Sequence, residues 1–248
     1  NRPEGMDYFN MVVAEIHGIR PMELVEHQKK GGKVVGSFCI HVPDEVVVAA
    51  GAIATGLCSG SQFWVPGGEK KLPTATCPLI KASLGARFDR TCPFFRLADL
   101  FVGETTCDGK KKAWEILAED APMYIMDIPQ MKRERDYAHW RDEIRGYIRR
   151  LEELTGNRVT EGSLHDAIVL LNGKRRALRR LSDFRKLDAV PISGKDVLLI
   201  TQIAFYDDPG RFTSMVNKLC DELDQRARAG VSVFPKGAKR ILFTGTPL

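Results

Sequence analysis

The chain has 248 residues, of which 44% are hydrophobic and 28% charged, and its formal net charge is +5. This composition is typical of a globular protein, and no window approaches the roughly 18 consecutive apolar residues of a membrane span. No secretory leader pattern opens the sequence, so a cytoplasmic protein without a membrane partner is expected. Much of the excess positive charge lies in the arginine-rich run 174–186 at helical spacing, which gives no reason to expect nucleic acid binding.

The first elements along the chain are predicted to be a helix, a strand and a second helix. The first helix ends at Lys30 before two glycines, and the apolar run 33–39 predicts a strand. The segment 43–54 predicts a helix, because its first turn is acidic, and Gly51 would permit close packing inside it. A loop with Cys58 and a Pro-Gly-Gly sequence follows.

The next elements repeat this alternation. A helix is predicted over 77–84, with proline in its first turn and Gly85 at its end. The apolar runs 97–104 and 122–129 predict two strands, and a helical pattern covers 110–119 between them. Strands that alternate with helices indicate a parallel sheet, whose ligands bind outside the carboxyl ends of the strands.

The second half of the chain has a different pattern. Long amphipathic helices are predicted over 136–154, 163–186, 195–205 and 211–229. We therefore predict an α/β protein with a Rossmann-like parallel sheet domain at 1–132 and an appended helical arm at 133–238. The run 239–248 predicts the first strand of a second α/β domain.

Five of the six cysteines lie within the first 107 residues. The predicted elements place Cys39 and Cys107 at carboxyl ends of strands and Cys77 at a helix N-terminus, where a thiolate is favoured by the helix dipole and by nearby lysines. No C-x-x-C pair is present, so a shared metal site would have to be assembled by folding. Each cysteine alone is also consistent with a buried structural thiol, which is the expectation for Cys220.

Several short motifs are specific when they occur together. They are Phe38-Cys39 with Pro43-x-Glu45, Cys77-Pro-Leu-Ile-Lys81, Cys92-Pro93, Thr-Thr-Cys107-Asp-Gly-Lys-Lys and Pro129-Gln130. With these motifs the chain resembles the 2-hydroxyacyl-CoA dehydratase and benzoyl-CoA reductase superfamily, and within it the double-cubane cluster proteins.

The resemblance implies an iron-sulfur cluster, either 4Fe-4S or double-cubane, between two related α/β domains. We carry the role of metal ligand to Cys39, Cys77 and Cys107, with Cys92 and Cys58 in reserve. A cluster shared between domains would lose ligands in this chain alone, which is expected to bind it poorly.

The resemblance also implies a reductase or dehydratase fed one electron at a time by an ATP-hydrolysing iron-sulfur activator. The substrate would be an acyl-CoA, and the protein a homodimer or heterodimer. Asp108 and Lys110 would orient the cluster loop, or else form a helix cap and a solvated basic turn. Glu45 would transfer a proton, or else complement the helix dipole.

Two alternatives come from other classes of protein. The chain could be a nonenzymatic electron carrier or docking subunit, which substrate turnover would distinguish from an enzyme. It could also be a plain α/β ligand-binding domain with free thiols, which the absence of iron after anaerobic purification would favour.

Overall fold

A computed structural model describes residues 2–38, 40–57, 59–235, 237–239 and 241 of the chain. The chain forms two compact units. The sheet unit comprises Glu15–Leu171 and Phe205–Asp207, and the helical unit comprises Asn1–Ala14, Asn172–Ala204 and Asp208–Leu248. The domain limits predicted at residues 132 and 238 stay a prediction.

A parallel sheet lies at the centre of the sheet unit. In the described part of the chain it has four strands in the order β2-β1-β3-β4, with bounds β1 Val34–Ser37, β2 Ile53–Gly56, β3 Leu100–Glu104 and β4 Met123–Met126. In the register, Val34 pairs with Ile53, Val35 with Leu100, and Phe101 with Met123. The predicted α/β class with a parallel sheet is confirmed.

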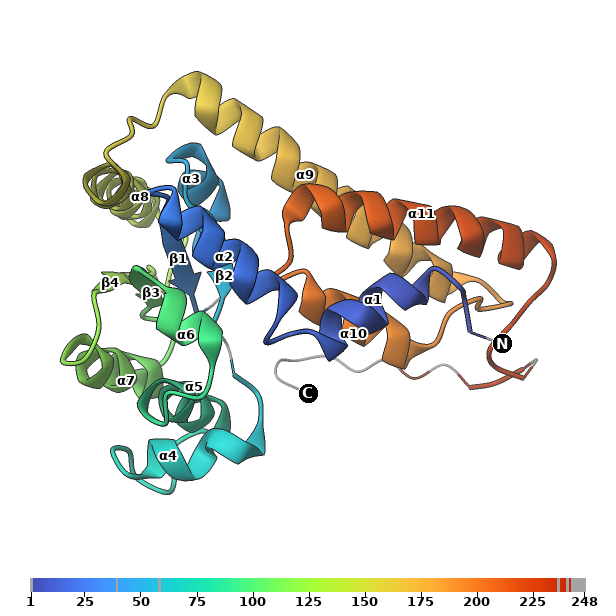
Figure 1. Ribbon diagram of the computed structural model, residues 1–248, viewed down its shortest axis with the longest axis horizontal. Helices are drawn as coiled ribbons and strands as arrows, with labels where there is room; N and C mark the ends of the chain where they lie inside the picture. The colour runs from blue at the N-terminus through green and yellow to red at the C-terminus, as the bar shows by residue number, and fades with distance from the viewer. Residues whose placement is uncertain (1, 39, 58, 236, 240, 242–248) are drawn as a thin grey trace. The chain divides into compact units, whose positions relative to one another are not determined.

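Helices cover both faces of this sheet. The helices of the sheet unit are α2 Ile19–Lys29, α3 Asp44–Ala49, α4 Val65–Glu69, α5 Pro78–Phe88, α6 Pro93–Leu97, α7 Asp108–Ala118, α8 Glu134–Thr155 and the first part of α9 Glu161–Asp183, with a short 3-10 helix at Gln62–Trp64; α4 and the 3-10 helix pack on α5 rather than on the sheet. In Figure 1, α3 and α8 lie above the sheet and α5 and α7 below it. The two central strands, β1 and β3, are buried on both faces, as expected for a doubly wound arrangement.

Successive side chains of β3 point to opposite faces of the sheet, and each face has its own hydrophobic core. Val102 belongs to a cluster with Val46 of α3 and Tyr147 of α8, whereas Phe101 packs on the other face. There the Phe101 ring lies 6.4 Å from that of Phe38, whose centroid is 4.4 Å from the Trp114 ring of α7. Each such buried aromatic side chain contributes about 1.5–3 kcal/mol to folding.

Three local predictions were wrong, each because of a glycine. The helix predicted over 43–54 ends at Ala49, because Gly51 has a φ of +76° that breaks the helix before β2. Gly85 does not end α5, which continues to Phe88, because Gly85 lacks the positive φ of a helix-ending glycine; it serves packing instead, since a Cβ there would lie 1.9 Å from the carbonyl oxygen of Trp64. The Pro-Gly-Gly sequence was expected in a loop but belongs to α4. Its glycines allow α4 and α5 to approach each other closely.

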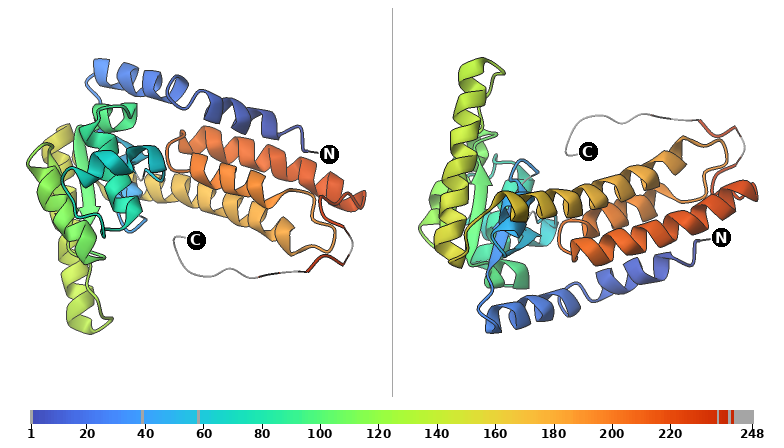
Figure 2. Two further views of the ribbon diagram at one scale, coloured as in Figure 1. Left: turned by 90° about the horizontal axis from the view of Figure 1, so that it is seen from below. Right: turned by 90° about the horizontal axis from the view of Figure 1, so that it is seen from above.

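The helical unit contains α1 Met6–Ala14, the second part of α9, the 3-10 helix Phe184–Lys186, α10 Gly194–Ile203 and α11 Pro209–Arg228. Figure 2 shows these helices running alongside one another. The Phe9 ring of α1 packs edge-on against Phe212 of α11 at 6.2 Å, and Ser193 and Asp208 cap α10 and α11. The long helices predicted in this half are confirmed, whereas α1 was not predicted. The strand predicted over 239–248 lies outside the described residues, apart from Lys239 and Ile241.

Candidate functional site

The order of the strands identifies one edge of the sheet as the place where a ligand would bind. Beyond β1 the chain crosses to β2 on one side, while β3 lies on the other side, so the connections diverge between β1 and β3. Ligands of parallel α/β sheets bind outside the carboxyl ends of the strands at such a point. Cys39 follows the end of β1 by two residues in the sequence, but Cys39 and Cys58 lie outside the described residues.

Cys77 and Cys107 occupy equivalent positions on two helices. Cys77 is the N-cap of α5 and Cys107 the N-cap of α7, and both side chains are exposed. The first turns of the two helices touch, because a Cβ at Gly109 would lie 2.8 Å from the Cδ1 atom of Ile80. The structure therefore brings two helix N-termini, each with an exposed cysteine, to one place, where negative charge is favoured.

Behind Cys107 lies a buried ion pair that sequence analysis missed. Glu104 ends β3 and is fully buried, and its Oε1 atom accepts a hydrogen bond from the Thr106 hydroxyl at 2.9 Å and pairs with the Lys110 ammonium. The indole nitrogen of Trp114 donates to the Glu104 carbonyl oxygen at 2.9 Å. Among the described residues, the Oε2 atom of Glu104 has no hydrogen-bond partner. These contacts fix the turn that presents Cys107.

Lys81, four residues after Cys77, supports the turn at Cys77 in the way that Lys110 supports the turn at Cys107. Lys81 is 4% exposed, and its ammonium donates to the Glu69 carboxylate at 2.6 Å and to the Thr74 carbonyl oxygen at 2.7 Å. It therefore joins α4 and the loop before Cys77 to the body of α5. Both lysines were expected beside thiolates, but the structure pairs each with a carboxylate.

The other predicted site residues have different surroundings. Asp108 is the first residue of α7, with an exposed side chain 3.5 Å from the Lys111 ammonium, so the expectation of a cap at Asp108 was wrong. Lys110 is largely buried, so the solvated basic turn considered for it was also wrong. Glu45 lies half-buried in the first turn of α3.

Cys92 and Cys220 are buried thiols. Cys92 is the N-cap of α6, and burial raises the pKa of its thiol against the opposing effect of hydrogen bonds from the Phe95 and Phe94 backbone. Burial in α11 raises the pKa of Cys220 to about 11, and the prediction of a buried thiol there is confirmed. Across the described residues, no three His, Cys, Asp or Glu side chains are grouped to hold a metal ion.

A hydrogen-bonded network fixes the loop after β4 at the same edge. The Thr105 hydroxyl donates to the Asp127 carboxylate at 2.6 Å and accepts from the Ile128 backbone at 2.9 Å. The Asp127 carboxylate also lies 3.1 Å from the His139 ring, and its backbone donates to Glu143 of α8 at 3.0 Å. The Thr105 hydroxyl, followed by His139, lowers the pKa of Asp127.

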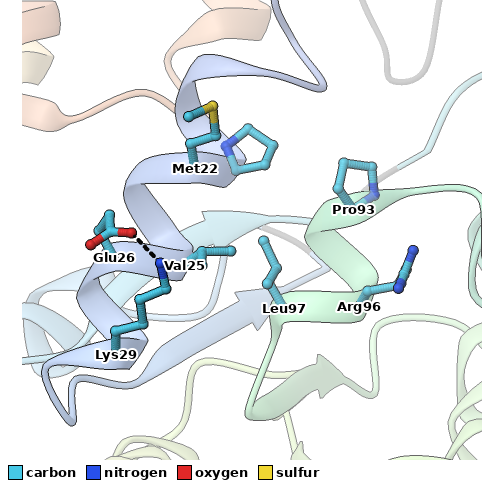
Figure 3. Close-up of a pocket in the computed structure, with 8 residues that line it drawn as sticks. Met22, Val25, Glu26, Lys29, Pro93, Arg96 and Leu97 are labelled. Atoms are coloured by element: carbon cyan, nitrogen blue, oxygen red, sulfur yellow. Dashed lines mark hydrogen bonds and ion pairs between the residues drawn. The ribbon is translucent and has the colours of Figure 1, made fainter.

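A cavity of about 440 Å³ lies between α2 and α6, away from the carboxyl edge of the sheet. Its walls include Met22, Val25 and Leu97, and Lys29 on its rim is paired with Glu26 at 2.6 Å (Figure 3). Both helices lead into the amino ends of strands, α2 into β1 and α6 into β3. The cavity therefore lies apart from the cysteines of α5 and α7.

The sheet and its exposed N-cap cysteines define a doubly wound α/β domain with a candidate ligand site at the carboxyl edge. The profile of the 2-hydroxyglutaryl-CoA dehydratase D-component family matches residues 39–248. The chain belongs to this family, which confirms the resemblance to the superfamily. No helix among the described residues is long and apolar enough to cross a membrane.

Three relatives illustrate the similarity. The chain is 36% identical over 229 residues to the provisionally named dehydratase subunit YjiM of Escherichia coli, covering 92% of this chain and 59% of that protein. It is 23% identical over 236 residues to the (R)-phenyllactyl-CoA dehydratase beta subunit of Clostridium sporogenes, covering 90% and 61%. It is 26% identical over 215 residues to the (R)-2-hydroxyglutaryl-CoA dehydratase subunit beta of Acidaminococcus fermentans, covering 81% and 53%. The chain thus spans little more than half the length of these relatives.

Proposed function

We propose that this chain is an iron-sulfur subunit of the 2-hydroxyacyl-CoA dehydratase type, and that Cys39, Cys77 and Cys107 bind its cluster, with Cys92 and Cys58 in reserve. The observation that carries the proposal is the pair of exposed cysteines at two touching helix N-termini. Thiolates are the usual protein ligands of iron-sulfur clusters, and helix N-termini favour the negative charge of a cluster and its ligands. The buried, proton-retaining thiol of Cys92 fits such a role less well.

The residues around the cysteines would hold this site in shape. Lys110, through Glu104, positions the turn with Cys107, and Lys81, through Glu69 and Thr74, positions the loop with Cys77. Asp108, whose exposed carboxylate opens the first turn of α7, would orient ligands at the cluster loop, and Glu45 at the start of α3 would transfer a proton to or from the substrate.

A bound cluster would supply one-electron transfer at low potential. We infer that the electrons come from an ATP-hydrolysing iron-sulfur activator and pass to an acyl-CoA substrate, as in a 2-hydroxyacyl-CoA dehydratase or a double-cubane reductase. Membership of the family and the names of two relatives as beta subunits of acyl-CoA dehydratases support this inference. The same names support a complex with a second subunit, and we propose that this complex is cytoplasmic.

Iron and acid-labile sulfide content, measured on protein made without oxygen, tests the cluster. The measurement compares this chain with a version extended to the length of its relatives. Iron in the extended protein should fall by at least half in Cys77→Ala and Cys107→Ala, and should persist in Cys220→Ala, whose thiol is buried in α11. An extended protein without iron would refute the proposal and favour a plain α/β domain with free thiols.

Substrate turnover separates an enzyme from an electron carrier. The iron-loaded protein, its reduced activator and ATP are incubated with 2-hydroxyacyl-CoA thioesters, and loss of the hydroxyl group is followed by mass spectrometry. Dehydrated product supports the dehydratase, whereas cluster reduction without product would favour the carrier or docking subunit.

A further inference from the structure

A second, smaller cavity lies at the carboxyl edge of the sheet. Its volume is about 230 Å³, and it is lined by the loops after β1 and β4 and by the first turns of α8. The lining residues are His41, Ile128, Pro129, Met131, Lys132, Asp136, Tyr137 and Trp140. The cavity is smaller than the roughly 300–1,000 Å³ typical of drug-sized ligands, so it suits a single ring or a short branched chain.

The chemistry of the walls limits the ligand further. Tyr137 and Trp140 supply aromatic surfaces, and Met131 and Tyr137 are 56% and 52% exposed, so they leave apolar surface uncovered. Aromatic faces of this kind bind flat apolar groups. The body of the ligand is therefore apolar and preferably planar.

The charged residues of the lining determine which polar group the ligand would carry. The Asp136 carboxylate is already bound by Arg133, which donates from its backbone at 2.9 Å and from its side chain at 2.7 and 3.1 Å. The ammonium of Lys132 forms no ion pair with any carboxylate that the structure describes, and its side chain is exposed at the cavity. The remaining charge of the lining is therefore positive.

The cavity is also held in shape before any ligand arrives. Thr105 fixes Asp127 and Ile128, and Glu143 of α8 accepts from the Asp127 backbone, so the loop that forms one wall is tied to β3 and to α8. The Arg133–Asp136 capping box fixes the start of α8, which forms the other wall. A preorganised cavity loses little free energy to ordering when it binds a ligand.

We propose that this cavity binds a small, flat, apolar carboxylate, whose ring lies against Tyr137 and Trp140 and whose negative charge faces Lys132. The inference goes beyond the proposed function, because binding of a free carboxylate requires no cluster. Either proposal can therefore fail while the other stands.

Isothermal titration calorimetry of the 248-residue chain with 3-phenylpropanoate tests this site. Lys132→Ala should weaken binding about tenfold, which corresponds to about 1.4 kcal/mol. The neutral amide of the same acid should bind wild type about as weakly as the acid binds this variant. Lys71→Ala, which removes an exposed lysine outside the cavity, should leave the affinity unchanged.

Two substitutions at Tyr137 test the aromatic wall. Tyr137→Ala should weaken binding about fivefold, whereas Tyr137→Phe should bind like wild type. Because the Tyr137 side chain is 52% exposed, neither change should disturb the fold, which circular dichroism verifies. No binding of 3-phenylpropanoate at millimolar concentration, or equal losses in Lys132→Ala and Lys71→Ala, would overturn the inference.

Discussion

Substitution of Lys110 by methionine should destabilise the sheet unit strongly. Glu104 is fully buried and the Lys110 side chain is 18% exposed, so the substitution leaves a buried carboxylate with only the Thr106 hydroxyl as a side-chain donor among the described residues. Loss of one partner of a buried pair costs about 3–5 kcal/mol. Because water can reach Lys110, we expect the lower end, about 3 kcal/mol.

Urea unfolding followed by tryptophan fluorescence measures this loss in the sheet unit alone. All three tryptophans, at positions 64, 114 and 140, lie in that unit. With a slope of about 2–3 kcal/mol per molar urea, the midpoint should fall by about 1–1.5 M. Lys111→Met is the matched control: its ammonium lies 3.5 Å from the exposed Asp108, and its removal should cause no measurable change.

A double substitution shows whether the charge is the cause. Glu104→Gln with Lys110→Met removes both charges from the interior, so the double variant should be more stable than Lys110→Met alone by about 2 kcal/mol. If Lys110→Met unfolds at the same urea concentration as Lys111→Met, the ion pair does not stabilise the sheet unit. If the effects of Glu104→Gln and Lys110→Met simply add in the double variant, the unpaired buried charge is not the cause of the loss.

Two further predictions concern packing and thiol reactivity. Gly85→Ala should lower the urea midpoint through a loss of at least 2 kcal/mol, because its methyl group would lie 1.9 Å from the Trp64 carbonyl oxygen. Gly162→Ala, whose nearest contact would be at 3.8 Å, should not lower it. With iodoacetamide at pH 8, peptide mass spectrometry should find exposed Cys77 modified orders of magnitude faster than Cys220, because Cys220 is buried and burial raises its pKa to about 11. Equal rates for the two thiols would contradict this.

The features predicted correctly are those with a local cause in the sequence. Alternating apolar runs and helical patterns indicated a parallel sheet, and Pro78 after Cys77 indicated a helix that begins there. The strand β2 was missed because its apolar residues continue the pattern of α3, and only the positive φ of Gly51 separates the two elements.

The missed parts of the candidate site depend on contacts between elements. The pairing of Glu104 with Lys110 joins the end of a strand to the first turn of the next helix, and no helical or strand period predicts such a contact. A glutamate at the end of the apolar run of β3 was the available signal. The partner of Lys81, Glu69, comes from a helix that the sequence predicted as a loop.

The two lysines of the cysteine motifs share one physical role. Lys81 and Lys110 each lie three or four residues beyond an exposed N-cap cysteine, and each pairs with a carboxylate on a neighbouring element. Each ammonium is thereby paired with a carboxylate, and the pair supports the turn that presents the cysteine. The motifs therefore combine two requirements: an exposed thiol at the positive end of a helix, and a largely buried ion pair that holds this end in place. If the cysteines bind a cluster, loss of either lysine should loosen the cysteine-bearing turn and so affect cluster retention before it affects substrate chemistry.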